Sequence, residues 1–248
     1  ALLFSQANIF QYASRADFKT HYLDAQAEGS RLQNFFTHDE IRNIDVYWPL
    51  KSDGNDRDYM LDRKLSDAIV ARIANATQQT FIYANKVGTH FPYHKSYPDP
   101  DKNLDKQSHY RAALGWAVDE FLVHLLRGLQ HAGKPVRIVY TSDHGQGLGE
   151  QGSDSTHCLP YRPASVQASV PLLLFSLNTE PFEQWQPQDG HYSQFQIFPS
   201  ILQMMGYPTD DVRARYGIDL SRPWPGKRFF YSGDLTGRGQ LSKNLFDT

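Results

Sequence analysis

Residues 136–150 read VRIVYTSDHGQGLGE, an alternating β-branched pattern that ends in a polar and glycine-rich loop. The alternation over Val136 to Tyr140 predicts a strand, and the residues after it predict a loop at the strand's carboxyl end. Asp143 and His144 therefore come together where a carboxylate oxygen and an imidazole nitrogen can both reach a cation such as Zn²⁺. Taken alone, such a pair is more often a capping carboxylate beside a solvated imidazole, so the rest of the sequence has to decide.

Helical and strand patterns alternate outward from this stretch. We expect helices at residues 16–27, 56–76, 110–129 and 194–205, and strands at residues 1–5, 81–84, 136–140, 170–175 and 228–231. The helix over 110–129 carries an apolar stripe of about five turns. Such alternation predicts an α/β fold, with a largely parallel sheet that has helices on both faces.

The composition excludes several classes of protein. With 248 residues, 40% of them hydrophobic and 21% charged, the chain is long enough for one large domain and is neither disordered nor a coiled coil. A net charge of -2 provides no basic stripe, so we expect no nucleic-acid partner. No apolar run approaches the ~20 residues that span a bilayer. Cys158 is the only cysteine, so no disulfide forms within the chain.

A second loop follows the strand predicted at residues 81–84. It carries Gly88-Thr89-His90 and several prolines, so it is not helical throughout. In parallel sheets the chemistry collects at the carboxyl ends of strands, which makes His90 a candidate beside Asp143 and His144. A lone histidine in a proline-rich loop is more often a surface residue.

The ordered set of motifs resembles the bacterial phosphoethanolamine transferases of the alkaline phosphatase and sulfatase superfamily. The stretch from Val139 to Glu150 resembles the S-D-H-G-x-x-L-G-E motif of that family. The further matches, in the family's order, are Gly88-Thr89-His90-Phe91-Pro92 with Tyr97-Pro98, the helix Tyr110 to Leu122 with Asp119, His157-Cys158-Leu159-Pro160-Tyr161, Gln167 to Leu172, and Tyr192 to Phe198 closing at Met205-Gly206. The ordered set of motifs is far more specific for this family than any single motif.

The resemblance implies an alkaline-phosphatase-like sandwich in which Asp143 and His144 ligate the catalytic zinc. It implies that His90 and His157 line the same site and bind the phosphate or the leaving group. An imidazole suits this role because it can donate to a phosphoryl oxygen and can deliver a proton to a departing alkoxide near neutral pH.

The resemblance also implies the substrates and the location. The parent protein would transfer phosphoethanolamine from phosphatidylethanolamine to lipid A, to the core sugars of lipopolysaccharide or to another glycan. It would present this domain, as a monomer, on the periplasmic face of the bacterial inner membrane. Contact with the membrane would run through transmembrane helices upstream.

The family pattern also contains elements that have no counterpart here. We expect residues 1–248 to be a single sulfatase-like catalytic domain that lacks the N-terminal strand with a carboxylate ligand and the helix with the threonine nucleophile. The chain alone should then be inactive, since the chemistry needs that hydroxyl. Three positions depart from the family's usual Glu, Gly and His, namely Gln146, Cys158 and Ser169. These departures bear on the choice of substrate more than on metal binding.

Two alternatives stay open. Cys158-Leu159-Pro160-Tyr161-Arg162 fits the C-x-P-x-R pattern of sulfatases, although sulfatases place that pattern before the D-H-G strand. A sulfatase or another phosphoester hydrolase of the same superfamily is therefore the second enzyme class. The third possibility is a non-catalytic fragment that binds a lipid or a glycan.

Overall fold

The computed structural model describes residues 7–26, 41–50, 58–149, 165–181, 185, 189–226, 230–233 and 239–242. These residues fall into two compact units, which we describe separately. The first unit contains Ala1–Pro135 and Phe198–Tyr216, and the second contains Val136–Ile197 and Gly217–Thr248. That residues 1–248 act as a single catalytic domain stays a prediction.

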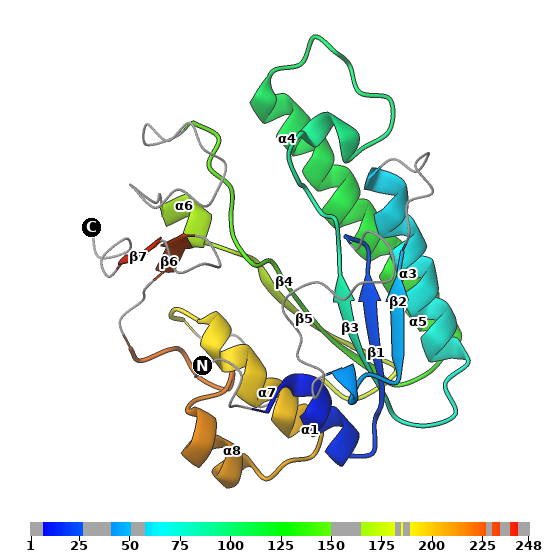
Figure 1. The fold of residues 1–248 in the computed structure, drawn as a ribbon, viewed down its shortest axis with the longest axis vertical. Helices are drawn as coiled ribbons and strands as arrows, with labels where there is room; N and C mark the ends of the chain where they lie inside the picture. Colours follow the sequence, from blue (N-terminus) through cyan, green and yellow to red (C-terminus); the bar gives the residue numbers. More distant parts are fainter. Residues whose placement is uncertain are drawn as a thin grey trace. The chain divides into compact units, whose positions relative to one another are not determined.

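The first unit is built on a parallel sheet of three strands in the order β2-β1-β3 (Figure 1). Its strands are β1 (Lys19–Asp24), β2 (Val46–Pro49) and β3 (Thr80–Asn85). Its helices are α1 (Ile9–Arg15), α3 (Asp58–Ala74), η2 (Tyr93–Lys95), α4 (Lys106–Leu114), η3 (Gly115–Glu120), α5 (Phe121–Ala132), α7 (Ile197–Met204) and α8 (Thr209–Tyr216).

The central strand β1 is covered on both faces. On one face, the Phe10 ring of α1 packs against Tyr22 and Tyr83, which are partners in the β1–β3 register. On the other face, the Arg72 guanidinium of α3 lies 4.4 Å from the ring centroid of Trp48, which pairs with Leu23. The expected α/β class, with helices on both faces of a parallel sheet, is therefore confirmed in this unit.

Helix α3 packs against α5, and both were expected from their apolar periodicity. The helices α4, η3 and α5 run without a break from Lys106 to Ala132, but the middle part, η3, is a π-helix. Gly133 ends the run in a left-handed conformation, with φ 67°.

A small aromatic core joins α1, α7 and α8. Tyr12, Leu202 and Val212 are buried there, one from each helix. The Tyr207 hydroxyl donates to the Tyr12 carbonyl (2.9 Å), so the chain after α7 is also tied to α1. Hydrophobic burial thus connects segments about 200 residues apart in the sequence.

The second unit contains two antiparallel pairs of strands, β4–β5 and β6–β7. Its elements are β4 (Val136–Thr141), α6 (Ser165–Ala168), β5 (Leu172–Leu177), η6 (Gln194–Gln196), β6 (Phe230–Gly233) and β7 (Gly239–Ser242). The antiparallel direction of β5 departs from the largely parallel pattern that alternation predicted.

Most predicted elements are present, but the helix predicted at residues 16–27 is wrong. Phe18, Tyr22 and Leu23 are spaced like one face of a helix, yet α1 ends at Arg15 and β1 begins at Lys19. Pairing with two neighbouring strands buries both faces of this segment, which leaves no polar face for a helix. The strand β2 was missed, and it lies between the helices predicted at residues 16–27 and 56–76. The strand predicted at residues 1–5 lies outside the described residues.

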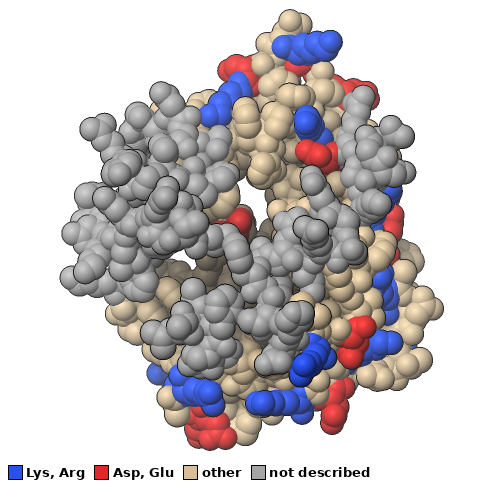
Figure 2. Space-filling view, in the orientation of Figure 1, with Lys and Arg blue, Asp and Glu red and all other residues tan. Residues whose placement is uncertain are grey.

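Charges of both signs lie beside one another on the face shown in Figure 2, among the residues that the structure describes. No helix in the described ranges is both long and apolar enough to cross a membrane.

Candidate functional site

The candidate metal donors stand on the loop after β4. Thr141 is the last residue of β4, and its hydroxyl donates to the Pro171 carbonyl (2.9 Å) just before β5. Four residues later, the Gly145 N–H donates to the Gln167 carbonyl (2.7 Å) of α6. A Cβ at position 145 would lie 2.0 Å from the Val166 carbonyl oxygen, so this close approach requires glycine.

One oxygen of the Asp143 carboxylate accepts hydrogen bonds within its own loop, and the other lies near the His144 ring. Its Oδ1 accepts from the His144 backbone N–H (3.0 Å) and from the Ser142 hydroxyl (3.4 Å). Its Oδ2 lies 3.8 Å from the His144 Nε2. The Asp143 side chain is 88% exposed, so solvent or an ion can reach it.

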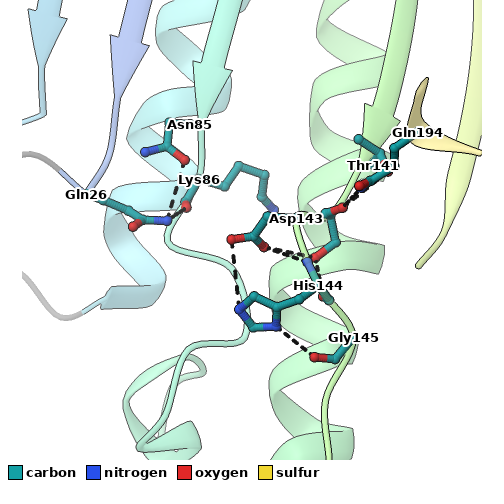
Figure 3. Close-up of polar contacts among 9 residues, drawn as sticks. Gln26, Asn85, Lys86, Thr141, Asp143, His144, Gly145 and Gln194 are labelled. Carbon is teal, nitrogen blue, oxygen red and sulfur yellow. Dashed lines mark hydrogen bonds and ion pairs between the residues drawn. The ribbon is translucent and has the colours of Figure 1, made fainter. Parts of the chain in front are cut away.

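The imidazole of His144 is hydrogen-bonded to the Gly145 carbonyl (Figure 3). Its Nδ1 lies 2.7 Å from the Gly145 carbonyl oxygen, which can only accept, so Nδ1 carries the proton. In the neutral ring the lone pair is then on Nε2, the atom that faces Asp143. Metal-binding histidines have this arrangement, in which the second ring nitrogen donates to a carbonyl or a carboxylate.

The donor set fits part of a zinc site. Two ligands about 2.1 Å from one tetrahedral zinc lie roughly 3.4 Å apart, close to the observed separation of 3.8 Å. A zinc site normally takes at least three protein ligands. Among the described residues, no group of three His, Cys, Asp or Glu side chains is placed to hold a metal. That Asp143 and His144 ligate a zinc ion therefore stays a prediction, although their spacing is compatible with two ligands of one site.

Two further side chains bear on this loop, one that binds it from another element and one that lies within it. The Gln194 Nε2, at the start of η6, donates to the Ser142 carbonyl (2.5 Å), a contact across 52 residues that no sequence signal indicated (Figure 3). The Gln146 Nε2 is buried and has no hydrogen-bond partner within the described part of the chain. A buried donor of this kind can accept an oxygen of a bound ligand as its partner.

His90 stands on the loop after β3 in the first unit. Its side chain is exposed, and its Nδ1 lies 2.7 Å from the Phe91 carbonyl, so it has the same tautomer as His144. Gly88 turns the chain just before it with φ 65°. The convergence of His90 with Asp143 and His144 on one site stays a prediction.

His157 and Cys158 lie outside the described residues, so their roles stay predictions. Sequence reasoning missed the side chains that hold the His90 loop. The Asp62 carboxylate accepts from the Val87 N–H (2.9 Å) and the Gly88 N–H (3.0 Å), and it pairs with the Lys86 ammonium (3.3 Å). The available signal was a charged residue, Asp62, next to the apolar stripe of α3.

The comparisons with known proteins agree on a superfamily. The sulfatase family model matches residues 2–207. Two curated relatives, the phosphoethanolamine transferases EptA of Escherichia coli O157:H7 and of Escherichia coli strain K12, are each 38% identical over 88 residues. That alignment covers 31% of this chain and 16% of each relative, so the chain matches only a small part of their length.

The fold is similar to that of a solved periplasmic domain. The C-terminal periplasmic domain of EcEptC from Escherichia coli matches 100% of this chain and 73% of its own, with a TM-score of 0.72 and 16% identity. The same domain in complex with Zn matches 98% of this chain and 72% of its own, with a TM-score of 0.72 and 17% identity. At this identity the similarity establishes the fold.

Proposed function

The chain belongs to the sulfatase family, and on that premise we propose that it forms part of the catalytic domain of a zinc-dependent phosphoethanolamine transferase. The observation that carries the proposal is the Asp143 and His144 pair, with His144 held in the tautomer that turns Nε2 toward the carboxylate. The local identity to EptA and the zinc complex of the EptC domain support the choice of reaction and metal.

Each residue has a distinct role in this proposal. Asp143 and His144 hold Zn²⁺, which when bound acts as a Lewis acid on phosphoryl oxygens and lowers the pKa of a nearby hydroxyl. His90 and His157, in their protonated imidazolium form, donate hydrogen bonds to the phosphoryl group, and one of them delivers its proton to the leaving alkoxide. The buried Gln146 amide supplies a further donor for a phosphoryl oxygen.

The proposed substrates follow from the relatives. The donor is phosphatidylethanolamine, and the acceptor is lipid A, a core sugar or another glycan. The EptC domain of similar fold is periplasmic, which supports the proposal that this domain works on the periplasmic face of the inner membrane. We propose that contact with the membrane is made by a region upstream of residue 1 and that the domain acts as a monomer.

The nucleophile is proposed to lie upstream as well. Thr89 is in the His90 loop, and Thr141 ends β4. Thr209 does begin a helix, α8, but its hydroxyl contacts the Gln203 side chain (3.5 Å) within the α7–α8 corner. None of these three has the setting expected for a metal-activated hydroxyl, and we propose that the 248-residue chain alone does not catalyse transfer.

The test is a transfer assay with fluorescent phosphatidylethanolamine in the presence of Zn²⁺. We compare the 248-residue chain with a version extended upstream through the expected nucleophile helix, and with the Asp143→Asn variant of that version. Only the extended wild type should transfer the head group. Transfer by the short chain would contradict an upstream nucleophile, and no transfer by the extended chain would contradict the function.

The family match also favours a second candidate, a sulfatase or another phosphoester hydrolase. Replacing the lipid with an aryl sulfate in the same assay distinguishes a sulfatase from the proposed transferase. Intact mass spectrometry adds an independent readout, because a sulfatase would carry an aldehyde at Cys158. An unmodified thiol at Cys158 and no sulfate release are expected.

A further inference from the structure

The backbone that leads from β3 to His90 is held by side chains from other elements. The Asn85 carbonyl accepts from the Ala25 N–H (2.8 Å) after β1. The Lys86 carbonyl accepts from the Gln26 Nε2 (2.5 Å), as Figure 3 shows. The next two N–H groups donate to Asp62, as described above. Successive polar groups of this segment therefore have partners that are distant in the sequence.

Gln26 and Asp62 form hydrogen bonds to the same peptide group from two sides. The Lys86 carbonyl and the Val87 N–H belong to one planar peptide group, so the two hydrogen bonds fix its position and its tilt together. Gln26 reaches it from the end of β1, and Asp62 reaches it from α3. We call this arrangement the peptide clamp.

The Asp62 side of the clamp is buried. The Asp62 side chain is 4% exposed, and the Lys86 side chain is 14% exposed. The Lys86 ammonium also donates to the Ala117 carbonyl and lies 3.6 Å from the centroid of the Phe121 ring. Burial lowers the pKa of Lys86, while the Asp62 charge raises it.

The Lys86 contact falls on the π-helical segment η3, which contains Ala117. A π-helical turn interrupts the regular ladder of helical hydrogen bonds, and such segments occur frequently at functional sites. The distortion of the helix therefore coincides with the point at which the end of β3 is attached to it.

We propose that Asp62 and Gln26 are positioning residues for His90. The clamp fixes the Lys86–Val87 peptide, Asp62 also fixes the Gly88 N–H, and the chain then turns at Gly88 to present His90 two residues later. Neither residue touches the substrate in this account. The inference rests on the proposed function only for what His90 does once it is in place.

The test measures the position of His90 directly in the 248-residue chain. Amide hydrogen exchange and NMR spectra of the histidine rings are recorded for wild type, for Asp62→Asn and for the control Asp67→Asn. Asp67 is also on α3 and also has a partner, His124 Nε2 at 2.5 Å, but its side chain is 60% exposed and its partner belongs to α5 rather than to the clamp. His90→Gln assigns the His90 resonances.

We expect Asp62→Asn to speed exchange at Val87 and Gly88 by about tenfold or more relative to the amides of β3, because a buried charged acceptor is lost. The His90 ring resonances should shift, and the control should change neither readout. Unchanged exchange and an unmoved His90, or a His90 shift no larger than that of the control, would overturn the proposal.

Gln26→Ala keeps the proposal testable if Asp62→Asn does not fold. Gln26 is exposed, so its loss should not endanger the fold. Exchange at Val87 should rise several-fold, with a smaller shift of His90 in the same direction. A Gln26→Ala chain with wild-type exchange at Val87 and wild-type His90 resonances would contradict the clamp. These readouts need neither zinc nor turnover, so failure of the proposed function would appear separately in the transfer assay.

Discussion

The loop after β3 and the loop after β4 are held in different ways. The first is fixed by side chains, since Gln26, just after β1, and Asp62, on α3, both bind the backbone that follows β3. The second also receives a side-chain bond, from Gln194, but its closest contact is backbone against backbone, because Gly145 lies directly on the Val166 and Ser169 carbonyls. The first arrangement depends on particular charges and amides, whereas the second depends on the absence of a side chain.

The glycines of the two loops illustrate the difference. Gly88 has φ 65°, and an added Cβ would meet no atom within 4 Å. Gly145 has no such positive φ, but an added Cβ would collide with two carbonyl oxygens. One glycine is needed for its backbone conformation and the other for space, so the same substitution should have unequal effects.

The largest effect is expected for Gly145→Ala. The methyl group would have to push back rigid backbone rather than a flexible side chain, and the bond to the Gln167 carbonyl would be lost. We expect the free energy of unfolding to fall by about 3 kcal/mol, measured by urea denaturation. A loss below about 1 kcal/mol would mean that the α6 backbone moves easily and that the loop after β4 is not fixed in this way.

Gly88→Ala should cost less, about 1 kcal/mol, because only the left-handed backbone conformation is penalised. The same urea titration provides the comparison. If Gly88→Ala destabilises the chain as much as Gly145→Ala does, the distinction between conformation and space is wrong.

The smallest expected effect is a change in the pH dependence of stability. Burial lowers the pKa of Lys86 below its ordinary value of 10.5. Between the lowered pKa and 10.5 the unfolded chain binds more protons than the folded chain, so Lys86 makes stability rise with pH in that window. Below the window both states are charged, and burial of the ammonium costs stability.

Lys86→Met keeps an apolar stem beside Phe121 and removes the titrating group. We expect the stability of wild type relative to Lys86→Met to increase as the pH rises through the lowered pKa of Lys86 toward 10.5. The difference in stability between the two proteins cancels the contribution of the tyrosines. Their raised pKa values make stability fall with rising pH at high pH, in both proteins alike. Two parallel pH profiles would show that Lys86 is not buried as described.

The sequence predicts the helices better than the sheet. The apolar stripes of α3 and α5 are local patterns, so both helices were found. The parallel pairing of β1 with β3 joins residues that are 61 positions apart, such as Lys19 and Thr80, whereas the spacing within the segment itself favoured a helix. The antiparallel direction of β5 has no local signal at all.

The residues around the candidate site also differ in how well the sequence predicts them. The position of Asp143 and His144 after a strand was predicted from the sequence and is confirmed, while their role as metal donors stays a prediction. Asp62 and Gln26 act through contacts made only when β1, α3 and β3 have assembled. Gln194 reaches Ser142 for the same reason. Side chains that hold a loop from a distance leave no pattern in that loop.

The central claim is that Asp143 and His144 are metal donors, and isothermal titration of the 248-residue chain with Zn²⁺ tests it most directly. Wild type should bind one zinc weakly, because two protein donors leave the other positions to water. Asp143→Asn and His144→Gln should each weaken binding about tenfold or more. The control is His131→Gln, since His131 is exposed and its Nδ1 also contacts a backbone carbonyl, that of Arg127 at 2.8 Å. Wild-type affinity in both site variants, or an equal loss in the control, would contradict the account.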